Sequence, residues 1–160
     1  RHRATLSPEG QVLVDGRPWN AEDVARDVET TAGAGARLAE SDREHRFDIL
    51  PLYITTDGML TAVGQDSRRF RPNLVIGGVP GLGERQWEGS QLRLGPAIIG
   101  VENLRARCIV TTFDPDSGQQ DIGVLRRIQR EFNRRLGLNC YVVTPGHISV
   151  GDTVELIPRP

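Results

Sequence analysis

Short runs of apolar residues, separated by glycine and proline, dominate the hydrophobic pattern of this chain. Each run has the length and the β-branched or leucine-rich composition of a strand and ends in residues that favour turns. The pattern predicts strands at residues 12–14, 36–38, 74–76, 92–94, 97–101, 108–112, 140–143 and 154–157. So many short strands at this spacing indicate a mostly β fold with a few helices, either a barrel or a sandwich.

Two short helices are expected between these strands. The first is predicted to begin at a cap formed by Asn20. The second is predicted to begin near Thr56, whose hydroxyl can accept a backbone N–H, and to stop at Gly64. The apolar residues that the two helices should bury are Val24, Val28, Leu60 and Val63.

The longest helical signal comes later in the chain and is expected to stop at Gly137. Its apolar residues fall on one face at helical spacing: Val124, Leu125, Ile128, Phe132 and Leu136. The other positions carry Arg126, Arg127, Arg130 and Arg134. The sequence favours an ordinary solvated helix face, with a surface for an anionic partner as the alternative.

Length and charge narrow the class of protein. The 160 residues fit one domain over positions 1–160, and a net charge of −1 gives no electrostatic argument for nucleic acid or an anionic membrane. No apolar run approaches the ~20 residues of a membrane helix. Two separated cysteines, Cys108 and Cys140, provide neither zinc-ligand spacing nor a disulfide framework, so a reducing cytoplasm is the expected location.

Cys108 is the main candidate for chemistry. It follows Arg105 and Arg107, and neighbouring cations favour the thiolate form of a cysteine, which is the form that binds metal. The alternative is a small buried hydrophobe within a strand, a common environment for free cysteine. Cys140 precedes Val142 in an apolar run and is expected in the core.

Arg71 and Asn73 flank a proline that fixes its own backbone and should push Arg71 into an extended conformation. A guanidinium can fork onto phosphate, and an amide offers both donors and acceptors, so the pair suits a phosphorylated heterocyclic cofactor. The structural alternatives are an ion pair of Arg71 with Asp66 or Glu84, and a turn closed by Asn73.

Two further segments have mainly structural interpretations. Asp114, Asp116 and Ser117 lie beside Pro115 and Gly118, a composition that favours a turn over a calcium site. On the strand predicted at 108–112, alternation places Thr112 on the face of the cysteine and Thr111 on the opposite face. No Gly-x-Ser-x-Gly elbow supports a serine hydrolase.

Five separated segments together resemble the MOSC domain family, named after the C-terminal domain of molybdenum-cofactor sulfurases. They read FDILPL at 47–52, RRFRPN at 68–73, ERQWEG at 84–89, RCIVTTFDPDSG at 107–118 and PGHISVGD at 145–152. The resemblance covers residues 47–160, leaves 1–46 as a divergent part, and implies a MOSC-type β-barrel with peripheral helices. A basic N-terminal strand usual in the family is not found, so we expect the chain to start inside the usual domain.

The resemblance also implies a cofactor and its contacts. It makes Cys108 the catalytic residue and the metal ligand of a molybdenum cofactor (molybdopterin), while pyridoxal phosphate is not expected within this domain. The residues that it places at the cofactor are Arg69, Arg71, Asn73, Asp48 and Thr112. Leu50 occupies a position that is commonly polar in the family, which weakens the contacts expected from that segment.

The family includes the mitochondrial amidoxime-reducing component, so the resemblance implies an oxidoreductase that reduces small N-hydroxylated or other N-oxygenated compounds with electrons from a redox partner. A sulfur-carrier module with a persulfide on Cys108, or a module that works with a cofactor-sulfurating or delivery protein, is one alternative. A metal-free binding or structural barrel is another. A homodimer, or an N-terminal segment outside this chain, would complete the barrel.

Overall fold

The structure is a computed structural model that describes residues 2–40 and 48–159. Contacts divide the chain into two compact units, Arg1–Glu44 and His45–Pro160. Phe47, with which the first of the five segments begins, lies outside the described residues. The single domain expected over residues 1–160 stays a prediction, because contacts within each unit do not decide whether the two units fold together.

The first unit contains a three-stranded antiparallel sheet and one helix. Its strands are β1 (Ala4–Leu6), β2 (Val12–Val14) and β3 (Arg17–Pro18), followed by α1 (Glu22–Ala32). Arg17 ties the sheet to the helix, since its guanidinium lies 2.8 Å from Asp23 and 2.7 Å from Asp27. The strand at residues 12–14 is confirmed, whereas residues 36–38 form no strand.

The start of α1 differs from its prediction. The N-cap residue is Ala21, which provides no side-chain cap, so the expected cap at Asn20 is wrong. Two carboxylates in the first turn, Glu22 and Asp23, favour the helix N-terminus electrostatically instead. Val24 is fully buried as predicted, and Val28 is half-buried.

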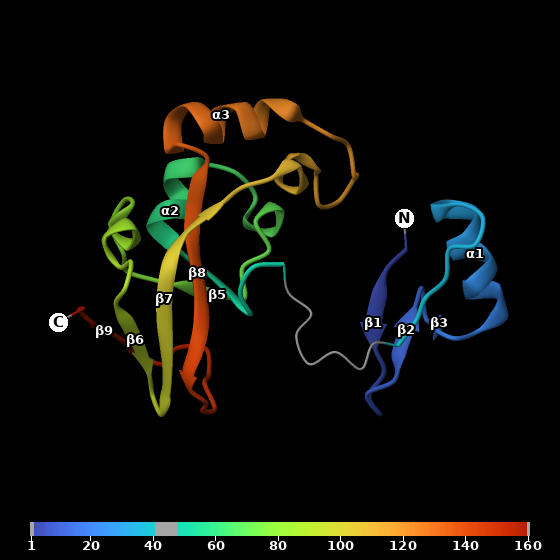
Figure 1. Ribbon diagram of the computed structural model, residues 1–160, viewed down its shortest axis with the longest axis horizontal. Helices are drawn as coiled ribbons and strands as arrows, with labels where there is room; N and C mark the ends of the chain where they lie inside the picture. Colours follow the sequence, from blue (N-terminus) through green and yellow to red (C-terminus); the bar gives the residue numbers. More distant parts are fainter. Residues whose placement is uncertain (1, 41–47, 160) are drawn as a thin grey trace. The chain divides into compact units, whose positions relative to one another are not determined.

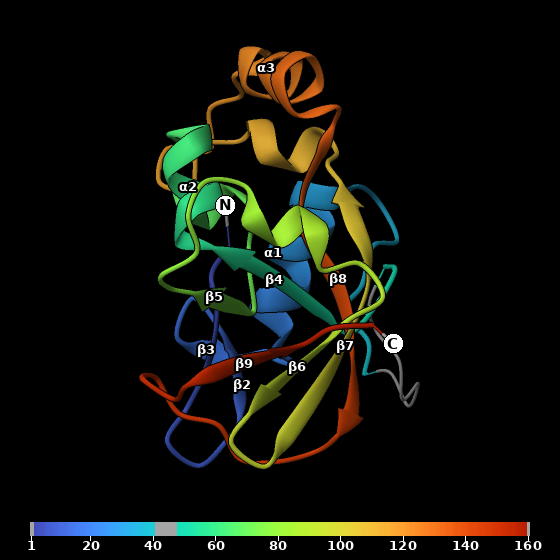
Figure 2. The same ribbon diagram turned by 90° about the vertical axis from the view of Figure 1, so that its left-hand side faces the viewer.

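The second unit is built on a curled six-stranded sheet that forms half a barrel (Figures 1 and 2). Its spatial order is β5-β4-β8-β7-β6-β9, and every neighbouring pair is antiparallel except β4 and β5. The strands are β4 (Leu52–Thr56), β5 (Leu74–Ile76), β6 (Gln91–Leu94), β7 (Ala97–Ala106), β8 (Arg135–Thr144) and β9 (Val154–Ile157). The curl brings the two outer strands together, because Val75 of β5 and Leu156 of β9 line the same pocket. The mostly β, barrel-type fold is therefore confirmed.

The first helix of this unit has the cap and the end that the sequence predicted. Helix α2 (Asp57–Val63) begins after Thr56, whose hydroxyl accepts the Met59 N–H at 3.1 Å. It ends at Gly64, which adopts the left-handed conformation with φ +60°. Three short 3-10 helices occur at η1 (Ser67–Arg69), η2 (Gly83–Gln86) and η3 (Ile109–Thr112).

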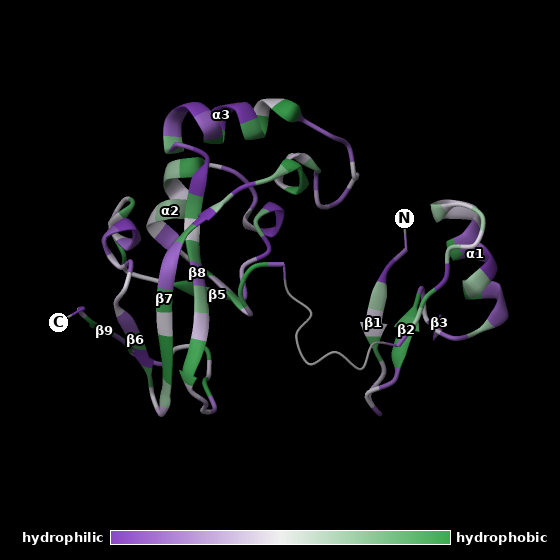
Figure 3. Ribbon diagram, in the orientation of Figure 1, coloured by the Kyte–Doolittle hydropathy of each residue, from purple (hydrophilic) through white to green (hydrophobic). Residues whose placement is uncertain are grey.

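The last helix is shorter than its prediction. Helix α3 (Ile122–Phe132) ends at Asn133, and Asn133 and Arg134 both have positive φ angles, 52° and 60°. Two consecutive left-handed residues turn the chain straight into β8, so Leu136 and Gly137 belong to a strand and the predicted stop at Gly137 is wrong. The apolar face is nevertheless correct, and Figure 3 shows hydrophobic and hydrophilic positions alternating along α3.

Two hydrophobic clusters cover opposite faces of the sheet. Adjacent residues of β4 contribute to different clusters, since Tyr53 faces α2 and α3 while Ile54 faces the inside of the curl. The first cluster contains Tyr53, Met59, Val63, Phe70, Val124, Ile128, Phe132 and Leu136. The second contains Ile54, Ile76, Leu92, Leu94, Ile99, Val101, Leu138 and Cys140. Cys140 is fully buried, as expected, and burial raises its pKa to about 12.

Candidate functional site

A cleft of about 390 Å³ collects most of the residues that the sequence singled out. Its walls come from the segment before β4, the segment before β5 and the end of β7. The lining residues are Asp48, Leu50, Pro51, Tyr53, Arg69, Phe70, Arg71, Asn73, Arg105, Ala106, Arg107, Cys108 and Val110. Five of the six predicted site residues are among them, and Thr112 is not.

Cys108 is exposed and lies between β7 and η3. The strand expected at residues 108–112 is therefore wrong. The Thr111 hydroxyl donates to the Cys108 carbonyl at 2.9 Å, and the Thr112 hydroxyl donates to the Ile109 carbonyl at 2.6 Å, so the two threonines close a 3-10 turn. Because the turn begins just after Cys108, the thiol stands at the cleft instead of within the sheet.

Thr112 is fully buried beneath this turn. The prediction that Thr111 and Thr112 lie on opposite faces of a strand is wrong, because both residues belong to the 3-10 turn and both are fully buried. The Thr112 hydroxyl accepts a hydrogen bond from Gln120 Nε2 at 3.2 Å, and its carbonyl accepts one from Arg69 Nη1 at 3.2 Å. Thr112 thus anchors the loop after Cys108, and its direct contact with a cofactor stays a prediction.

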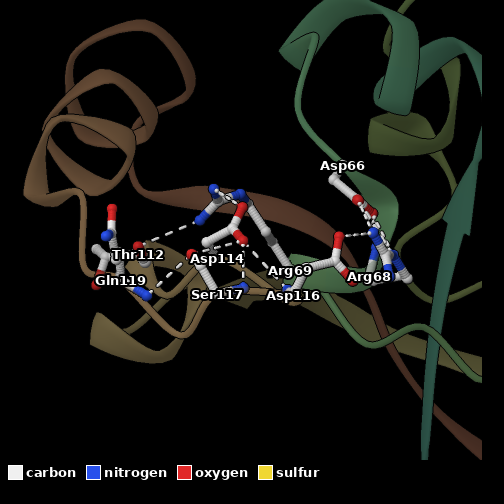
Figure 4. Close-up of polar contacts among 8 residues, drawn as sticks. All are labelled: Asp66, Arg68, Arg69, Thr112, Asp114, Asp116, Ser117 and Gln119. Carbon is white, nitrogen blue, oxygen red and sulfur yellow. Dashed lines mark hydrogen bonds and ion pairs between the residues drawn. The ribbon is translucent and has the colours of Figure 1, made fainter.

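Arg69 links the two arginine-containing segments (Figure 4). Its Nη2 lies 3.0 Å from Asp114 Oδ2, and its side chain is only 11% exposed. The other Asp114 oxygen, Oδ1, accepts hydrogen bonds from the Ser117 N–H and hydroxyl, both at 2.9 Å, which confirms the predicted turn. These Ser117 hydrogen bonds, more than Arg69, hold the pKa of Asp114 below its usual value.

Arg68 makes a second, exposed link between the same segments (Figure 4). Its Nη2 lies 2.7 Å from both Asp66 Oδ2 and Asp116 Oδ2, and its side chain is 57% exposed. Hydrogen bonds from Arg68 hold the pKa of both carboxyls below the usual value. Asp66 therefore pairs with Arg68 instead of Arg71.

Arg71 adopts a conformation that the sequence analysis did not expect. Its φ angle is +54°, in the left-handed region, so the prediction of an extended residue before Pro72 is wrong. A left-handed conformation costs a non-glycine residue about 1–2 kcal/mol. Such strain persists where surrounding structure over-determines it and is concentrated at functional sites. Here it accompanies an exposed guanidinium on the wall of the cleft.

Asn73 makes backbone-like contacts with the start of the sheet. Its side-chain oxygen accepts the Tyr53 N–H at 2.7 Å, and its own N–H donates to the Tyr53 carbonyl at 2.8 Å. Asn73 thus extends the parallel pairing of β4 and β5 by one step. These contacts do not form the turn that was the structural alternative for Asn73, since they join it to a residue 20 positions away. A contact of Asn73 with the cofactor stays a prediction.

Three of the lining residues with polar or charged side chains were not assigned as site residues from the sequence: Tyr53, Arg105 and Arg107. The Arg107 guanidinium lies over the Tyr53 ring, 4.5 Å from its centroid, and 5.5 Å from the centroid of the Phe70 ring. Arg105 lies 5.6 Å from the Tyr53 centroid and donates to Asn139 Oδ1 at 2.8 Å. The alternating Arg105 and Arg107 beside the cysteine were the available signal, but their stacking on Tyr53 depends on tertiary contact.

The cleft carries an excess of positive charge. It is lined by four arginines and one carboxylate, Asp48, which lies 3.8 Å from Arg105 and whose side chain is 84% exposed. Arg107 is only 7% exposed, and burial lowers the pKa of its guanidinium. An exposed thiol beside several guanidiniums can bind a soft metal centre that carries an anionic group.

Comparison with known proteins places this chain in a family. The MOSC domain model matches residues 57–155, which is more than half of the chain and includes every predicted site residue except Asp48. The chain belongs to the MOSC domain family. Membership is consistent with a function related to the molybdenum cofactor.

Two curated relatives illustrate the similarity. Molybdenum cofactor sulfurase 2 of Culex quinquefasciatus is 38% identical over 74 residues, which are 46% of this chain and 10% of that protein. Mitochondrial amidoxime-reducing component 1 of Homo sapiens is 32% identical over 101 residues, which are 55% of this chain and 29% of that protein. The match thus spans less than a third of either relative.

Solved structures support the fold of this MOSC chain. The YUAD protein from Bacillus subtilis superposes with a TM-score of 0.54 at 20% identity and covers 72% of this chain and 68% of its own. YiiM from Escherichia coli gives 0.50 at 21% identity, with 70% of this chain and 56% of its own covered. At these identities the similarity shows the fold alone.

Two negative findings apply to the part of the chain that the structure describes. Residues 2–40 and 48–159 contain no group of three or more His, Cys, Asp or Glu side chains placed to hold a metal ion. Within the same residues, no helix has the length and apolar character needed to cross a bilayer.

Proposed function

We propose that this MOSC domain binds the molybdenum cofactor in the arginine-lined cleft, with Cys108 as the metal ligand, and acts as an oxidoreductase on small N-hydroxylated compounds. The observation that carries the proposal is the exposed Cys108 thiol in a cleft lined by four arginines. The amidoxime-reducing and sulfurase relatives support a cofactor of this kind. This chain matches only a part of each relative, so an activity, a substrate or a partner like theirs is a proposal for this chain.

The chemistry of the lining residues fits this cofactor. A thiolate is a soft ligand of the type that a molybdenum centre accepts, and guanidiniums bind a terminal phosphate through forked hydrogen bonds. Arg107 adds an independent sign of fit, because its Nε and Nη1 atoms are buried without a hydrogen-bond partner among the described residues. A buried cation of this kind is stabilised by an anion placed nearby.

When bound, the cofactor would supply the two-electron oxygen transfer. The protein residues would position it and shape the surroundings. Cys108 would provide the thiolate, Arg71 and Asn73 would contact the phosphate and the heterocycle, and Arg69 would keep the loop after Cys108 in place through Asp114. Asp48 would contact the cofactor from the segment before β4. Electrons would come from a separate redox protein.

Pyridoxal phosphate does not fit this chain. All 20 of its Lys and Arg residues are arginine, so no lysine side chain is present to hold that cofactor through an amine. The proposal therefore concerns molybdenum chemistry alone.

Turnover of an N-hydroxylated amidine tests this function. Protein loaded with the cofactor would be supplied with a chemical reductant, and formation of the amidine would be followed by chromatography. Wild type and Cys140→Ala are expected to form product, whereas Cys108→Ser is expected to lose at least about a hundredfold in rate, since it removes the metal ligand. Loaded wild-type protein without turnover would contradict the oxidoreductase function.

A sulfur-carrier role is the second candidate, favoured by the exposure of Cys108 and by the sulfurase relative. Here Cys108 would hold a persulfide for transfer to a cofactor bound elsewhere. Mass spectrometry after incubation with a cysteine desulfurase and cysteine would decide it. An added sulfur atom on Cys108, combined with no turnover by the loaded protein, would favour the carrier over the oxidoreductase.

A further inference from the structure

The 3-10 helix η3 has its polar and apolar side chains in an inverted arrangement. Thr111 and Thr112 are fully buried, and their hydroxyls donate to carbonyls of the same turn. Three apolar residues beside them are exposed: Ile109, Val110 and Phe113. The Phe113 N–H donates to the Val110 carbonyl at 3.3 Å, which keeps the three on one turn. Adjacent apolar side chains at a surface indicate a binding site, whereas single ones need no explanation.

Val110 brings this apolar surface into the cleft. It lines the same cleft of about 390 Å³ as Cys108, which precedes it by two positions. Leu50, half-buried in the segment before β4, lines the cleft as well. The cleft therefore has an apolar part, formed by Val110 and Leu50, in addition to its arginines.

Two carboxylates that flank the apolar residues are engaged in the fold. Asp114 accepts hydrogen bonds from Ser117 and pairs with Arg69. Asp121 caps α3 by accepting the Gly123 N–H at 2.8 Å. Because these carboxylates are satisfied by contacts within the chain, the apolar surface between them suits an uncharged group.

We infer that Val110 and Leu50 bind the apolar group of the substrate, and that the chain selects N-hydroxylated compounds with an aryl or long alkyl group over small polar ones. A substrate that reacts at a metal held by Cys108 has its remaining atoms beside η3, because that turn begins directly after the cysteine. A cleft of this size admits a small molecule, which favours the substrate over a partner protein as the occupant. The inference rests on the proposed function for the reaction, whereas the apolar surface belongs to the chain itself.

Two amidoximes with the same reacting group test this preference. Benzamidoxime carries an aryl group and acetamidoxime only a methyl group, and each would be supplied to loaded protein with a chemical reductant. Wild type is expected to favour benzamidoxime in kcat/KM by at least about tenfold, since the ring buries apolar area against Val110. Val110→Ser and Leu50→Ser are each expected to lower this ratio at least about threefold, because each removes apolar contact area.

Binding without turnover gives a second measurement. Metal-free protein labelled with nitrogen-15 would be titrated with benzamidoxime and followed by NMR. The amide signals of residues 109–113 are expected to shift, and Val110→Ser is expected to weaken binding at least about threefold. Val143→Ser is the matched control, because Val143 is an exposed valine of β8 that does not line the cleft, and it is expected to bind as wild type does.

A substrate ratio in Val110→Ser equal to that in Val143→Ser would overturn the inference and leave the exposed turn to a partner protein. Wild-type protein whose signals at residues 109–113 do not respond to benzamidoxime would also overturn it. Binding that depends on Val110, in a chain that turns over neither amidoxime, would sustain the apolar site and sink the proposed function. Turnover of both amidoximes at the same ratio in every variant would do the reverse.

Discussion

Arg69 and Asp114 lie 45 residues apart in the sequence and form an ion pair with 3.0 Å between Nη2 and Oδ2. Arg69 precedes Arg71 in the segment before β5, and Asp114 belongs to the loop that follows Cys108. The pair therefore joins the two segments that contribute the thiol and the exposed guanidinium to the cleft. A hydrogen bond from Arg69 to the Thr112 carbonyl, at 3.2 Å, strengthens the same connection.

Replacing Arg69 should loosen this connection. Arg69→Gln is expected to lower the melting temperature and the cofactor content, because the Arg69 side chain is only 11% exposed and contacts two positions of the loop. Arg68→Gln is the control, since Arg68 is 57% exposed and exposed ion pairs contribute little. Thermal unfolding and metal analysis of both variants would check this, and equal losses would contradict the role given to Arg69.

The left-handed backbone of Arg71 should lower the stability of the folded protein, while its guanidinium serves ligand binding. Arg71→Gly is expected to be more stable than Arg71→Ala by roughly 1 kcal/mol, because only glycine adopts positive φ without strain. Both variants remove the guanidinium and are expected to lose cofactor binding. Urea unfolding gives the stability difference. An alanine variant as stable as the glycine variant would show that the left-handed backbone carries no cost.

The position of the Tyr53 ring should depend on the absence of a side chain at Gly137, because the ring packs directly against that residue. A Cβ at Gly137, where φ is +67°, would lie 2.5 Å from Tyr53 Cε2, whereas a Cβ at Gly95, where φ is +54°, would meet no atom within 4 Å. Gly137→Ala is therefore expected to lose about 1–3 kcal/mol more stability than Gly95→Ala. It should also displace the Tyr53 ring, over which Arg105 and Arg107 lie, and lower the cofactor content. Similar stability losses in both variants would contradict the close packing of Tyr53.

Glu84 should make stability depend on pH. It is fully buried, its Oε2 accepts the Thr56 hydroxyl at 3.2 Å, and its Oε1 has no hydrogen-bond partner among the described residues. Burial raises the pKa of its carboxyl above the ordinary value of 4.5. Because the folded-state pKa is the higher one, the stability from Glu84 is fully present below that ordinary value and is lost as pH rises through the folded-state pKa.

Glu84→Gln should remove this dependence. At neutral pH it is expected to be more stable than wild type by roughly 1–3 kcal/mol, the cost of a buried group left without a partner. Near pH 4 the two proteins should be similar. Urea unfolding at both pH values would check this, and a variant that is less stable than wild type at neutral pH would show that ionised Glu84 is stabilised.

Local sequence patterns predicted the parts of the fold that depend on local chemistry. The cap at Thr56, the stop at Gly64 and the strands at residues 74–76 and 154–157 follow from short-range preferences. Strand β4 was not predicted, although it lies between β5 and β8 in the sheet. Only its end residues were assigned from the sequence, Leu52 to a motif and Thr56 to a helix cap. The four residues from Tyr53 to Thr56 are all buried, since both faces of the sheet are covered there, so the strand shows no alternation of apolar and polar positions.

The cleft could be predicted in part. Motif segments located Cys108, Arg69, Arg71, Asn73 and Asp48, which share one cleft. The 3-10 turn after Cys108 was read as a strand because Ile109, Val110 and two threonines favour strands, whereas their hydroxyls bond back to the chain. Arg107 could not be assigned from sequence, because its importance comes from stacking on Tyr53, which lies far from it along the chain.

Molybdenum content of protein produced with cofactor supply tests the central claim most directly. Mass spectrometry of the metal would be combined with fluorescence of the oxidised pterin, for wild type, Cys108→Ser and Cys140→Ala. The account predicts near-equal metal and protein in wild type and in Cys140→Ala, and loss of the metal in Cys108→Ser. Metal retained by Cys108→Ser, or no molybdenum in wild type, would contradict the assignment of Cys108 as the ligand.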